Sequence, residues 1–384
     1  MLAHRLRDQN LAPFRLGESG ATVKILMMSY AYPPSTGGIE TFSSLLREAL
    51  VECGQQIRVV TDIAATMPED EEHRVLRRPD RVSLKEAIGW ADVCAVSGVS
   101  LRFQIPALRL GKPLTIIHHK WQEREDSTVD LRRRLRLWVC RFGLNIAVNS
   151  VLARDLKPPA LTIPNPLRGE IDLGAPFADR PRDLVFLGRL VSEKGVSVLL
   201  DAIARLHERG VFVTATVIGD GPLRAALEQQ AAKVKIPSNI EFAGRLAPEQ
   251  FQPLLRRHKI IVVPSVYKEA FGIVTLEGLA AGCMTLVSNA GGLPEAAGTA
   301  GMTFPMGDSA ALAGIIEKLL ADPAATETFR AATPGHLEGF RPARIAERYL
   351  TVFERLYFYH SVKRIGRGKA IRRTVEELGS GSAA

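Results

Sequence analysis

The chain has 384 residues, enough for two or three domains of about 150 residues each. Hydrophobic residues make up 46% and charged residues 24%, values typical of a globular chain and not of a disordered or membrane-embedded one. Four cysteines without metal-ligand spacing exclude a disulfide framework and a zinc site, and suit a reducing cytoplasmic compartment. Neither a secretory signal nor a membrane-spanning run of about 18 apolar residues is found.

The formal net charge is +9, and the excess of basic residues is concentrated in residues 101–150 and 358–384. Nucleic-acid binding would favour basic residues interleaved with aromatic ones. Aromatic residues are only 6% of the chain and do not follow that pattern. We therefore expect no nucleic acid, and instead an anionic small molecule or an anionic membrane surface as a partner.

The first half of the chain alternates short apolar runs with helical patterns. A buried strand is predicted over 23–29, an amphipathic helix over 39–53 and a second strand over 57–60, which together form a βαβ unit. Further strands are predicted at 93–96, 114–117 and 146–148, with a basic helix over 131–142. This alternation indicates a parallel, doubly wound sheet.

A second α/β set follows a Pro- and Gly-rich segment. Strands are predicted at 184–187, 213–218, 240–242, 260–263 and 284–287, and helices at 196–209, 223–232, 248–257, 273–281 and 310–320. The predicted organisation is an extension (1–20), an N-terminal Rossmann-like domain (21–165), a linker (166–182), a C-terminal Rossmann-like domain (183–340), a helix (341–357) and a basic flexible tail (358–384). In two such domains, the carboxyl ends of the strands would face each other across a cleft.

Glycine-rich turns follow several predicted strands, where ligands bind in such sheets. Gly37 and Gly38 open onto a helix, where backbone amides can approach a phosphate. Arg189 and Lys194 leave the strand at 184–187 and could grip a diphosphate, while Gly219 lies in a third turn. The alternatives are a plain helix cap for the glycines and solvated surface positions for the charges.

The most specific segment is 264–282. Glu269 lies in the loop after a strand and Glu277 lies in the following helix, which Gly272 opens. Amides around Gly272 would donate hydrogen bonds to a phosphate, and the two carboxylates would accept hydrogen bonds from sugar hydroxyls at a solvent-facing cleft. A solvated loop and helix face is the alternative reading for the two glutamates.

Five motifs in order carry a resemblance that runs from about Val23 to Tyr357. They are Ser-Tyr-x-Tyr-Pro-Pro-x-x-Gly-Gly-Ile-Glu, Gly-Arg-Leu-x-x-Glu-Lys-Gly, Gly-Asp-Gly-Pro, Glu-x7-Glu and Gly-Gly-Leu-Pro-Glu. The chain resembles retaining glycosyltransferases of the GT-B fold, family 4 type (glycosyl transferases group 1). The resemblance implies that the C-terminal domain binds a sugar nucleotide, that the N-terminal domain binds the acceptor, and that the helix over 341–357 crosses back to the N-terminal domain.

The resemblance also assigns roles to single residues. It implies that Arg189 and Lys194 hold the donor diphosphate, that Glu277 binds the ribose and that Glu269 binds the donor sugar. Phe271, Gly272 and Ile273 would line the phosphate, and Gly37 and Gly38 would close on the donor. The family keeps a histidine near the reaction centre, for which this chain offers His118 and His119; spacing to Trp121 favours the former and spacing from Pro113 the latter. Of the two, His118 is the one we expect in this role. A structural histidine capping the strand is the alternative.

The sequence departs from the family pattern at two places. Lys268 precedes Glu269, and Cys283-Met284-Thr285 lies where such proteins usually carry a proline near the base. These departures leave the base of the donor nucleotide undetermined.

The function expected from this resemblance is the transfer of a hexosyl unit from a nucleoside-diphosphate sugar to a hydroxyl acceptor, a glycan or a lipid-linked precursor of polysaccharide biosynthesis. Transfer would retain the anomeric configuration and need no metal and no cofactor, because Arg189, Lys194 and a helix N-terminus stabilise the leaving diphosphate. The alternatives are a catalytically silent sugar-nucleotide-binding subunit and a GT-B nucleotide-sugar epimerase.

The basic helix adds an expectation about location. Apolar residues recur at helical spacing between Leu131 and Phe142, and five arginines occupy much of the remaining surface. Such a helix suits peripheral binding to an anionic membrane, at its inner face, where a lipid-linked acceptor is found. Packing of the apolar stripe on the sheet, with solvated arginines, is the alternative.

Overall fold

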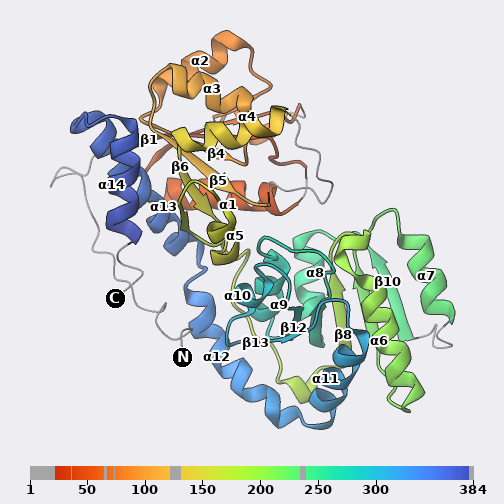
Figure 1. Ribbon diagram of the computed structural model, residues 1–384. Coiled ribbons are helices and arrows are strands. Elements are labelled where there is room, and N and C mark those ends of the chain that lie inside the picture. The colour runs from red at the N-terminus through yellow and green to blue at the C-terminus, as the bar shows by residue number, and fades with distance from the viewer. Residues whose placement is uncertain are drawn as a thin grey trace. The chain divides into compact units, whose positions relative to one another are not determined.

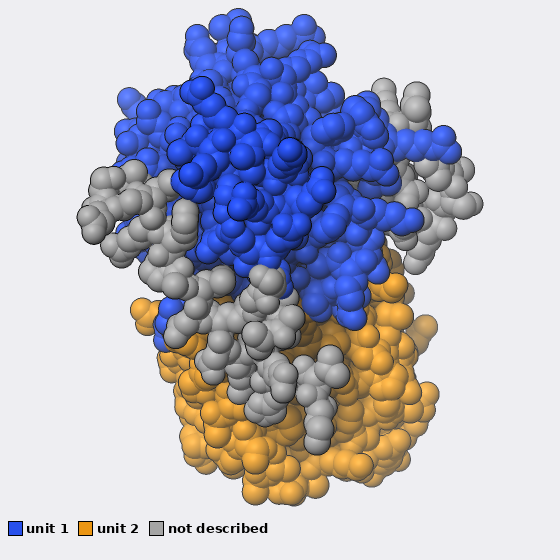
Figure 2. All heavy atoms as spheres, turned by 60° about the vertical axis from the view of Figure 1, so that its left-hand side comes forward, with its two compact units in different colours: residues 1–166, 341–384 blue, residues 167–340 orange. Residues whose placement is uncertain are grey.

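The computed structural model describes residues 22–35, 37–64, 67–72, 74–121, 131–233 and 239–379. The chain forms two compact units, coloured separately in Figure 2. Unit 1 comprises residues 1–166 and 341–384, and unit 2 comprises residues 167–340. Each unit is an α/β layer structure around its own parallel sheet, as the alternation of apolar runs and helical patterns predicts.

Within the described residues, unit 1 contains one seven-stranded sheet of order β3-β2-β1-β4-β5-β6-β7. Figure 1 shows helices α2, α3 and α4 on one side of these strands and α1 and α13 on the other. The elements of unit 1 are β1 (Lys24–Ser29), α1 (Gly38–Glu52), β2 (Gln56–Thr61), β3 (Val75–Arg77), α2 (Arg81–Trp90), β4 (Val93–Ser97), α3 (Leu101–Arg109), β5 (Leu114–His118), α4 (Leu131–Val139), β6 (Leu144–Ala147), α5 (Ser150–Asp155), β7 (Ala160–Thr162), α13 (Pro342–Tyr357) and α14 (Arg367–Gly379).

Unit 2 has, in its described part, a six-stranded sheet of order β10-β9-β8-β11-β12-β13. Its elements are β8 (Arg182–Leu187), α6 (Val196–Glu208), β9 (Ala215–Ile218), α7 (Arg224–Lys233), β10 (Ile240–Gly244), α8 (Pro248–Leu255), β11 (His258–Val263), α9 (Ile273–Ala280), β12 (Met284–Ser288), α10 (Leu293–Ala297), β13 (Gly301–Phe304), α11 (Ser309–Ala321) and α12 (Glu327–Glu338).

Both faces of the unit 2 sheet are buried, which explains why its strands are continuous apolar runs. Leu184 and Phe186 of β8 face one core cluster, which α6, α7 and α11 complete. Val185, between them, faces the opposite cluster with side chains of α8. The pairing of β8 with β9 and β11 is parallel throughout, so the loops that follow these strands lie at one edge of the sheet.

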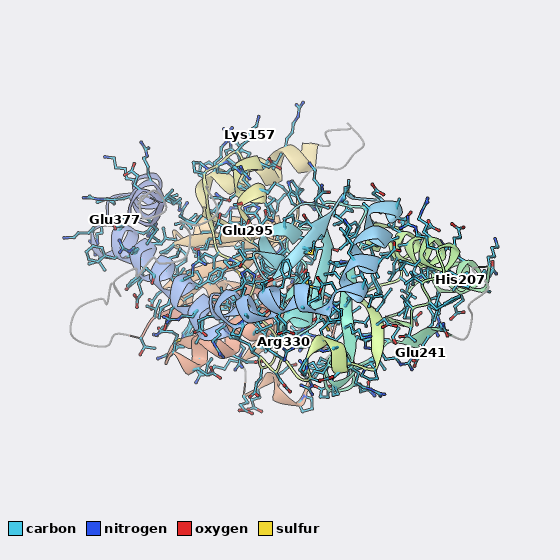
Figure 3. All side chains as sticks on the ribbon, turned by 90° about the horizontal axis from the view of Figure 1, so that it is seen from below. Lys157, His207, Glu241, Glu295, Arg330 and Glu377 are labelled. Carbon is cyan, nitrogen blue, oxygen red and sulfur yellow. The ribbon has the colours of Figure 1, made fainter. Side chains whose placement is uncertain are left out.

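The segment predicted as a linker, 166–182, is corrected by the structure, because residues 167–182 belong to unit 2. The buried Arg180 guanidinium donates to the carbonyl oxygens of His258 at 2.7 Å and Ala281 at 2.9 Å. Arg330 of α12, labelled in Figure 3, donates to the carbonyl oxygens of Leu173 at 3.0 Å and Gly174 at 2.8 Å. These bonds attach the segment to the body of unit 2.

The predicted flexible tail is likewise corrected for residues 367–379, which form α14. Ala370, Thr374 and Leu378 are buried at four-residue intervals, so one face of α14 packs on unit 1. Glu377, labelled in Figure 3, accepts hydrogen bonds from the Arg355 guanidinium of α13 and from the hydroxyl of Tyr359. Residues 380–384 and the predicted extension, 1–20, lie outside the described residues.

Candidate functional site

The functional residues that the sequence predicts for the C-terminal domain lie in loops at one edge of the unit 2 sheet. Arg189 and Lys194 follow β8, Gly219 follows β9, and Glu269 follows β11. Strands β9, β8 and β11 are neighbours in the sheet and run parallel. Their carboxyl ends therefore share an edge, where ligands bind in open α/β sheets.

Glycines let these loops approach one another backbone to backbone. A Cβ added to Gly195 would lie 1.9 Å from the carbonyl oxygen of Pro264, and one added to Gly219 would lie 1.8 Å from that of Gly188. Gly195 has a φ of +65°, in the left-handed region that favours glycine. Only glycine fits at these positions, and the close approach holds the loop after β8 against the loop after β11.

Lys194 and Glu269 meet directly at this edge. Lys194 Nζ lies 2.7 Å from Glu269 Oε1, and their side chains are 26% and 11% exposed. The hydroxyl of the buried Ser265 donates a hydrogen bond to the same carboxylate oxygen. Sequence reasoning missed Ser265, although it stands two residues after the end of β11, in the most specific segment. The pair places one cation and one carboxylate where a ligand can meet both.

The N-terminus of α9 lies beside this pair. Its cap residue, Gly272, has a φ of +78°, and a Cβ added to it would lie 3.5 Å from Glu269 Oε2. The first-turn amides of Ile273 and Val274 have no carbonyl partner four residues earlier within the helix. Phe271 is buried, with its ring centroid 5.9 Å from that of Phe340, so its side chain contributes packing beside the helix end. An anion is favoured at this helix end.

Glu277 is placed differently from the sequence expectation of a solvent-facing carboxylate. It is 6% exposed in α9, and its Oε1 lies 3.5 Å from Nη1 of Arg168. Burial raises the pKa of this carboxyl above its usual value, while the Arg168 guanidinium opposes that rise. Arg168 could not be predicted as the partner of Glu277, because the pairing joins α9 to a segment more than 100 residues earlier. Arg189 is exposed, and in the described part of unit 2 we find no ion pair between it and either glutamate.

In unit 1, His118 is a buried residue at the end of β5. Its Nε2 lies 2.8 Å from Oδ1 of Asn145. The Nδ2 of Asn145 donates to the carbonyl oxygens of Cys140 and Gly143, each at 3.0 Å, so Oδ1 is left to accept and His118 Nε2 carries the proton. Burial lowers the pKa of His118, which favours the neutral ring. These bonds suit a structural histidine.

His119 has a different environment. Both ring nitrogens are shielded from solvent and find no hydrogen-bond partner among the described residues, and the ring meets that of Phe42 edge-on at 4.5 Å. Burial, with a smaller contribution from His118, lowers the pKa of His119 to about 3. The ring is therefore uncharged at neutral pH, and within the described residues neither nitrogen is satisfied by a hydrogen bond.

Gly37 and Gly38 lie at the start of α1, after β1. Gly37 has an extended φ of 166°, and a Cβ added to it would lie 2.7 Å from Oε2 of Glu40. Oε1 of Glu40 accepts a hydrogen bond of 3.2 Å from the Ser35 hydroxyl. The two glycines therefore lie in unit 1, in a turn that side-chain contacts hold.

A search of the described ranges finds no group of three or more His, Cys, Asp or Glu side chains suited to hold a metal ion. In the same ranges, no helix has both the length and the apolar character needed to cross a membrane.

Comparisons with known proteins match the part of unit 2 that contains the candidate site. Residues 170–335 match the family described as glycosyl transferases group 1, which confirms the predicted resemblance to glycosyl transferases group 1 in this region. A glycogen synthase of Mycobacterium tuberculosis is 37% identical over 202 residues, which are 50% of this chain and 49% of that protein. A phosphatidyl-myo-inositol mannosyltransferase of Mycobacterium leprae is 29% identical over 260 residues, covering 65% of this chain and 69% of that one.

The chain thus spans about half the length of the first curated relatives it matches. Among solved structures, Anabaena Alr3699/HepE in complex with UDP superposes with a TM-score of 0.71 at 19% identity, covering 86% of this chain and 99% of that one. This likeness concerns the fold and confirms the GT-B prediction, with two Rossmann-like parallel-sheet units.

Proposed function

We propose, on the premise that residues 170–335 form a glycosyl transferases group 1 domain, that this chain transfers a hexosyl unit from a nucleoside-diphosphate sugar to a hydroxyl acceptor. Unit 2 binds the donor and unit 1 binds the acceptor, a glycan or a lipid-linked precursor. The related mannosyltransferase and glycogen synthase support this substrate class, and the structure of HepE with UDP supports the nucleotide.

The observation that carries the proposal is the Lys194–Glu269 pair beside the N-terminus of α9. A sugar nucleotide carries a diphosphate next to a ring of hydroxyl groups. The Lys194 ammonium and the first-turn amides of α9 suit the diphosphate, and the Glu269 carboxylate suits the hydroxyls. Glu277 binds the ribose in this proposal, and its burial with Arg168 fixes the carboxylate in place.

The chemistry follows from where charge develops. Breaking the bond to the leaving diphosphate places negative charge on phosphate oxygens and positive charge on the anomeric carbon. Arg189, Lys194 and the α9 N-terminus stabilise the phosphate charge by preorganised electrostatics, so this proposal needs no metal ion. Retention of the anomeric configuration follows if the acceptor attacks from the face that the diphosphate leaves, with the leaving phosphate taking the acceptor proton.

The geometry favours His119 over His118 as the histidine near the reacting sugar. His118 is held by Asn145 inside the sheet, whereas both nitrogens of His119 are without partners in the part of the chain that the structure describes. A neutral imidazole can accept or donate one hydrogen bond at each nitrogen. His119 therefore serves as a hydrogen-bonding group for a sugar hydroxyl and not as a cation.

The test is a thermal-shift screen of UDP-, GDP- and ADP-sugars, followed by product analysis with the best donor. A ligand at a hundred times its dissociation constant stabilises the fold by about 2.7 kcal/mol. Transfer, or slow donor hydrolysis without acceptor, supports the enzyme, and a changed sugar on the same nucleotide indicates an epimerase. Binding without any turnover indicates a silent subunit. Loss of turnover in EDTA with rescue by magnesium contradicts the role given to Arg189 and Lys194.

We also propose that α4 binds an anionic membrane surface. Leu135, Leu137 and Trp138 are 40%, 38% and 52% exposed, so much of the apolar surface of α4 is not covered by the sheet. Arg134 and Arg136 lie on the same helix and are exposed. The side chains of residues 131–133, which the sequence analysis included, lie outside the described residues. Exposed Trp and Leu beside arginines suit the interface of an anionic bilayer.

Sedimentation with vesicles tests the membrane proposal. We expect binding to vesicles that contain phosphatidylglycerol, weaker binding at high salt, and little binding to neutral vesicles. Arg134→Gln/Arg141→Gln should weaken binding about thirtyfold, at about 1 kcal/mol for each charge, and Trp138→Ala should weaken it further. Lys85→Gln/Arg154→Gln, which alters two exposed basic residues elsewhere on unit 1, is the control. Equal binding to neutral and anionic vesicles contradicts the proposal.

A further inference from the structure

Unit 1 contains a pocket of about 380 Å³ that the proposed function does not use. Its lining includes Tyr30 after β1, Ser100 after β4 and Lys120 after β5. These three strands are neighbours in the order β2-β1-β4-β5, and the chain reverses its direction of winding between β1 and β4. In a doubly wound sheet, that reversal opens the crevice in which ligands bind. The volume lies within the range of about 300–1,000 Å³ typical of small-molecule sites.

The charged side chains that line the pocket are all basic. Arg102 is compensated, because it pairs with Asp62 and donates to the carbonyl oxygen of Pro79 at 2.8 Å. Lys120 and Arg136 also line the pocket, and among residues 22–121 and 131–379, as far as these are described, neither has a carboxylate within ion-pair distance. The pocket therefore carries an excess of positive charge, which an anion would balance.

Neutral hydrogen-bonding groups complete the lining. Ser100 is the N-cap of α3, yet its side chain makes no capping hydrogen bond, so the hydroxyl remains available to a ligand. The Tyr30 ring lies against Gly98, whose added Cβ would be 2.7 Å from Tyr30 Cε1. Lys120 Nζ lies 5.7 Å from the centroid of that ring. Two ammonium or guanidinium groups beside two hydroxyls suit a phosphate, which accepts several charge-assisted bonds.

We propose that this pocket, between Lys120 and Arg136, binds a phosphate group of the acceptor, so that the acceptor substrate is a phosphorylated molecule. The inference rests on the proposed function in assigning the acceptor to unit 1. His119 directly precedes Lys120, so phosphate binding would hold the acceptor near the proposed sugar-binding histidine. Arg136 belongs to α4, the helix proposed to bind the membrane, and the phosphate is therefore that of a soluble sugar phosphate or of a lipid headgroup.

Isothermal titration with inorganic pyrophosphate tests the pocket. Because pyrophosphate would also bind at the donor groups, the titration uses the full chain with Arg189→Ala/Lys194→Ala. This chain should still bind pyrophosphate, and adding Lys120→Gln/Arg136→Gln should weaken binding tenfold or more. Lys85→Gln/Arg109→Gln removes the same charge from exposed positions of unit 1 and should change binding less than twofold. The proposal is overturned if the Arg189→Ala/Lys194→Ala chain does not bind pyrophosphate. It is also overturned if the pocket pair and the control pair weaken binding equally.

Two further probes distinguish the sources of the phosphate. Glycerol 3-phosphate competing with pyrophosphate indicates a soluble acceptor. Weaker sedimentation with phosphatidic acid vesicles on Lys120→Gln, which leaves the membrane-binding helix α4 unchanged, than on Lys85→Gln indicates a lipid headgroup. If glycerol 3-phosphate does not compete and vesicle binding does not depend on the pocket, the proposal is wrong. The donor assignment is tested separately. Lys120→Gln/Arg136→Gln in the otherwise native chain should leave the affinity for UDP unchanged within twofold. If the native chain itself does not bind UDP, the proposed function is wrong.

Discussion

The two units fix their functional loops by different means. In unit 2, glycines bring backbone against backbone: an added Cβ would lie 1.9 Å from a carbonyl oxygen at Gly195 and 2.2 Å at Gly291. In unit 1, the nearest atoms at Gly37 and Gly98 belong to the side chains of Glu40 and Tyr30, both at 2.7 Å. A carbonyl within the fold cannot turn away, whereas a side chain can change rotamer.

This difference matches the different tasks proposed for the units. A diphosphate and a ribose are the same in every donor of one nucleotide, and rigid loops supply preorganised groups at no cost during the reaction. An acceptor varies more in shape, and loops held by side chains can adjust to it. The comparison therefore predicts that equivalent changes have large effects in unit 2 and small effects in unit 1.

The largest expected effect is that of Gly195→Ala. The left-handed conformation costs about 1–2 kcal/mol for an L-residue, and the clash with Pro264 adds about 1–3 kcal/mol. We expect the free energy of unfolding of unit 2 to fall by about 3 kcal/mol or more in urea titrations. Gly307→Ala is the matched control, because Gly307 has a similar φ of +79° with no atom within 4 Å of an added Cβ. Equal losses in the two variants would contradict a rigid backbone contact.

The next effect concerns the charged pair that the rigid loops hold. Lys194→Ala should weaken UDP binding by about 1.5–3 kcal/mol, or roughly ten to a hundred and fifty fold, in calorimetric titrations. Lys259→Ala is the control, since Lys259 Nζ pairs with Asp183 at 3.0 Å and its side chain is 23% exposed, against 26% for Lys194. Similar losses in both variants would mean that Lys194 acts through the fold and not on the donor.

A third effect contrasts the buried histidines. His258 of unit 2 has both ring nitrogens bonded, to the Leu254 carbonyl and the Thr216 hydroxyl, each at 2.8 Å, whereas neither nitrogen of His119 has a partner in the described residues. The pKa of His119 is lowered to about 3 in the folded chain, whereas a histidine in the unfolded chain has a pKa near 6.5. Below about pH 6.5, His119 therefore takes up a proton when the chain unfolds. Its contribution to stability is present above that value and is lost as the pH falls toward 3.

His119→Phe should therefore lose less stability than the native chain between pH 7 and pH 5. The expected difference is about 1–2 kcal/mol, measured as the change in unfolding free energy in urea at the two pH values. An identical pH dependence in the two proteins would show that His119 is accessible to protons in the folded state, and would remove the basis for treating its ring as neutral.

The smallest effect is expected for Gly37→Ala in unit 1. The extended φ of Gly37 suits any residue, and the Glu40 carboxylate can move aside. The unfolding free energy should change by no more than about 0.5 kcal/mol. A loss comparable to that of Gly195→Ala would remove the contrast between the two units.

Much of the fold could be predicted from the sequence, because long buried strands alternate with amphipathic helices. The short elements were missed. β3 and β7 have three residues each and lie at the edges of the sheet, so they carry too few apolar positions to show a period. α14 was assigned to a flexible tail because its basic residues mask the few small or apolar ones that pack.

The positions of the candidate site residues were predictable where a motif directly follows a buried strand. Lys194, Glu269 and Gly272 lie together at the expected sheet edge. The different surroundings of His118 and His119 were not predictable, because both faces of a parallel sheet are buried and the alternation of side chains then gives no direction. The partners Ser265 and Arg168 depend on tertiary packing that no local pattern records.

The amide of Leu167 donates to the carbonyl oxygen of Phe340 at 2.7 Å, and these are the first and last residues of unit 2. The two ends of unit 2, the unit proposed to bind the donor, thus meet at one hydrogen bond, and unit 2 is an insertion within the sequence of unit 1. The entropic cost of bringing the two ends of an inserted segment together grows only slowly with the length of the segment. All seven strands of the unit 1 sheet, as far as the chain is described, come from residues outside 167–340, so replacing this segment with that of a relative would leave their order unchanged.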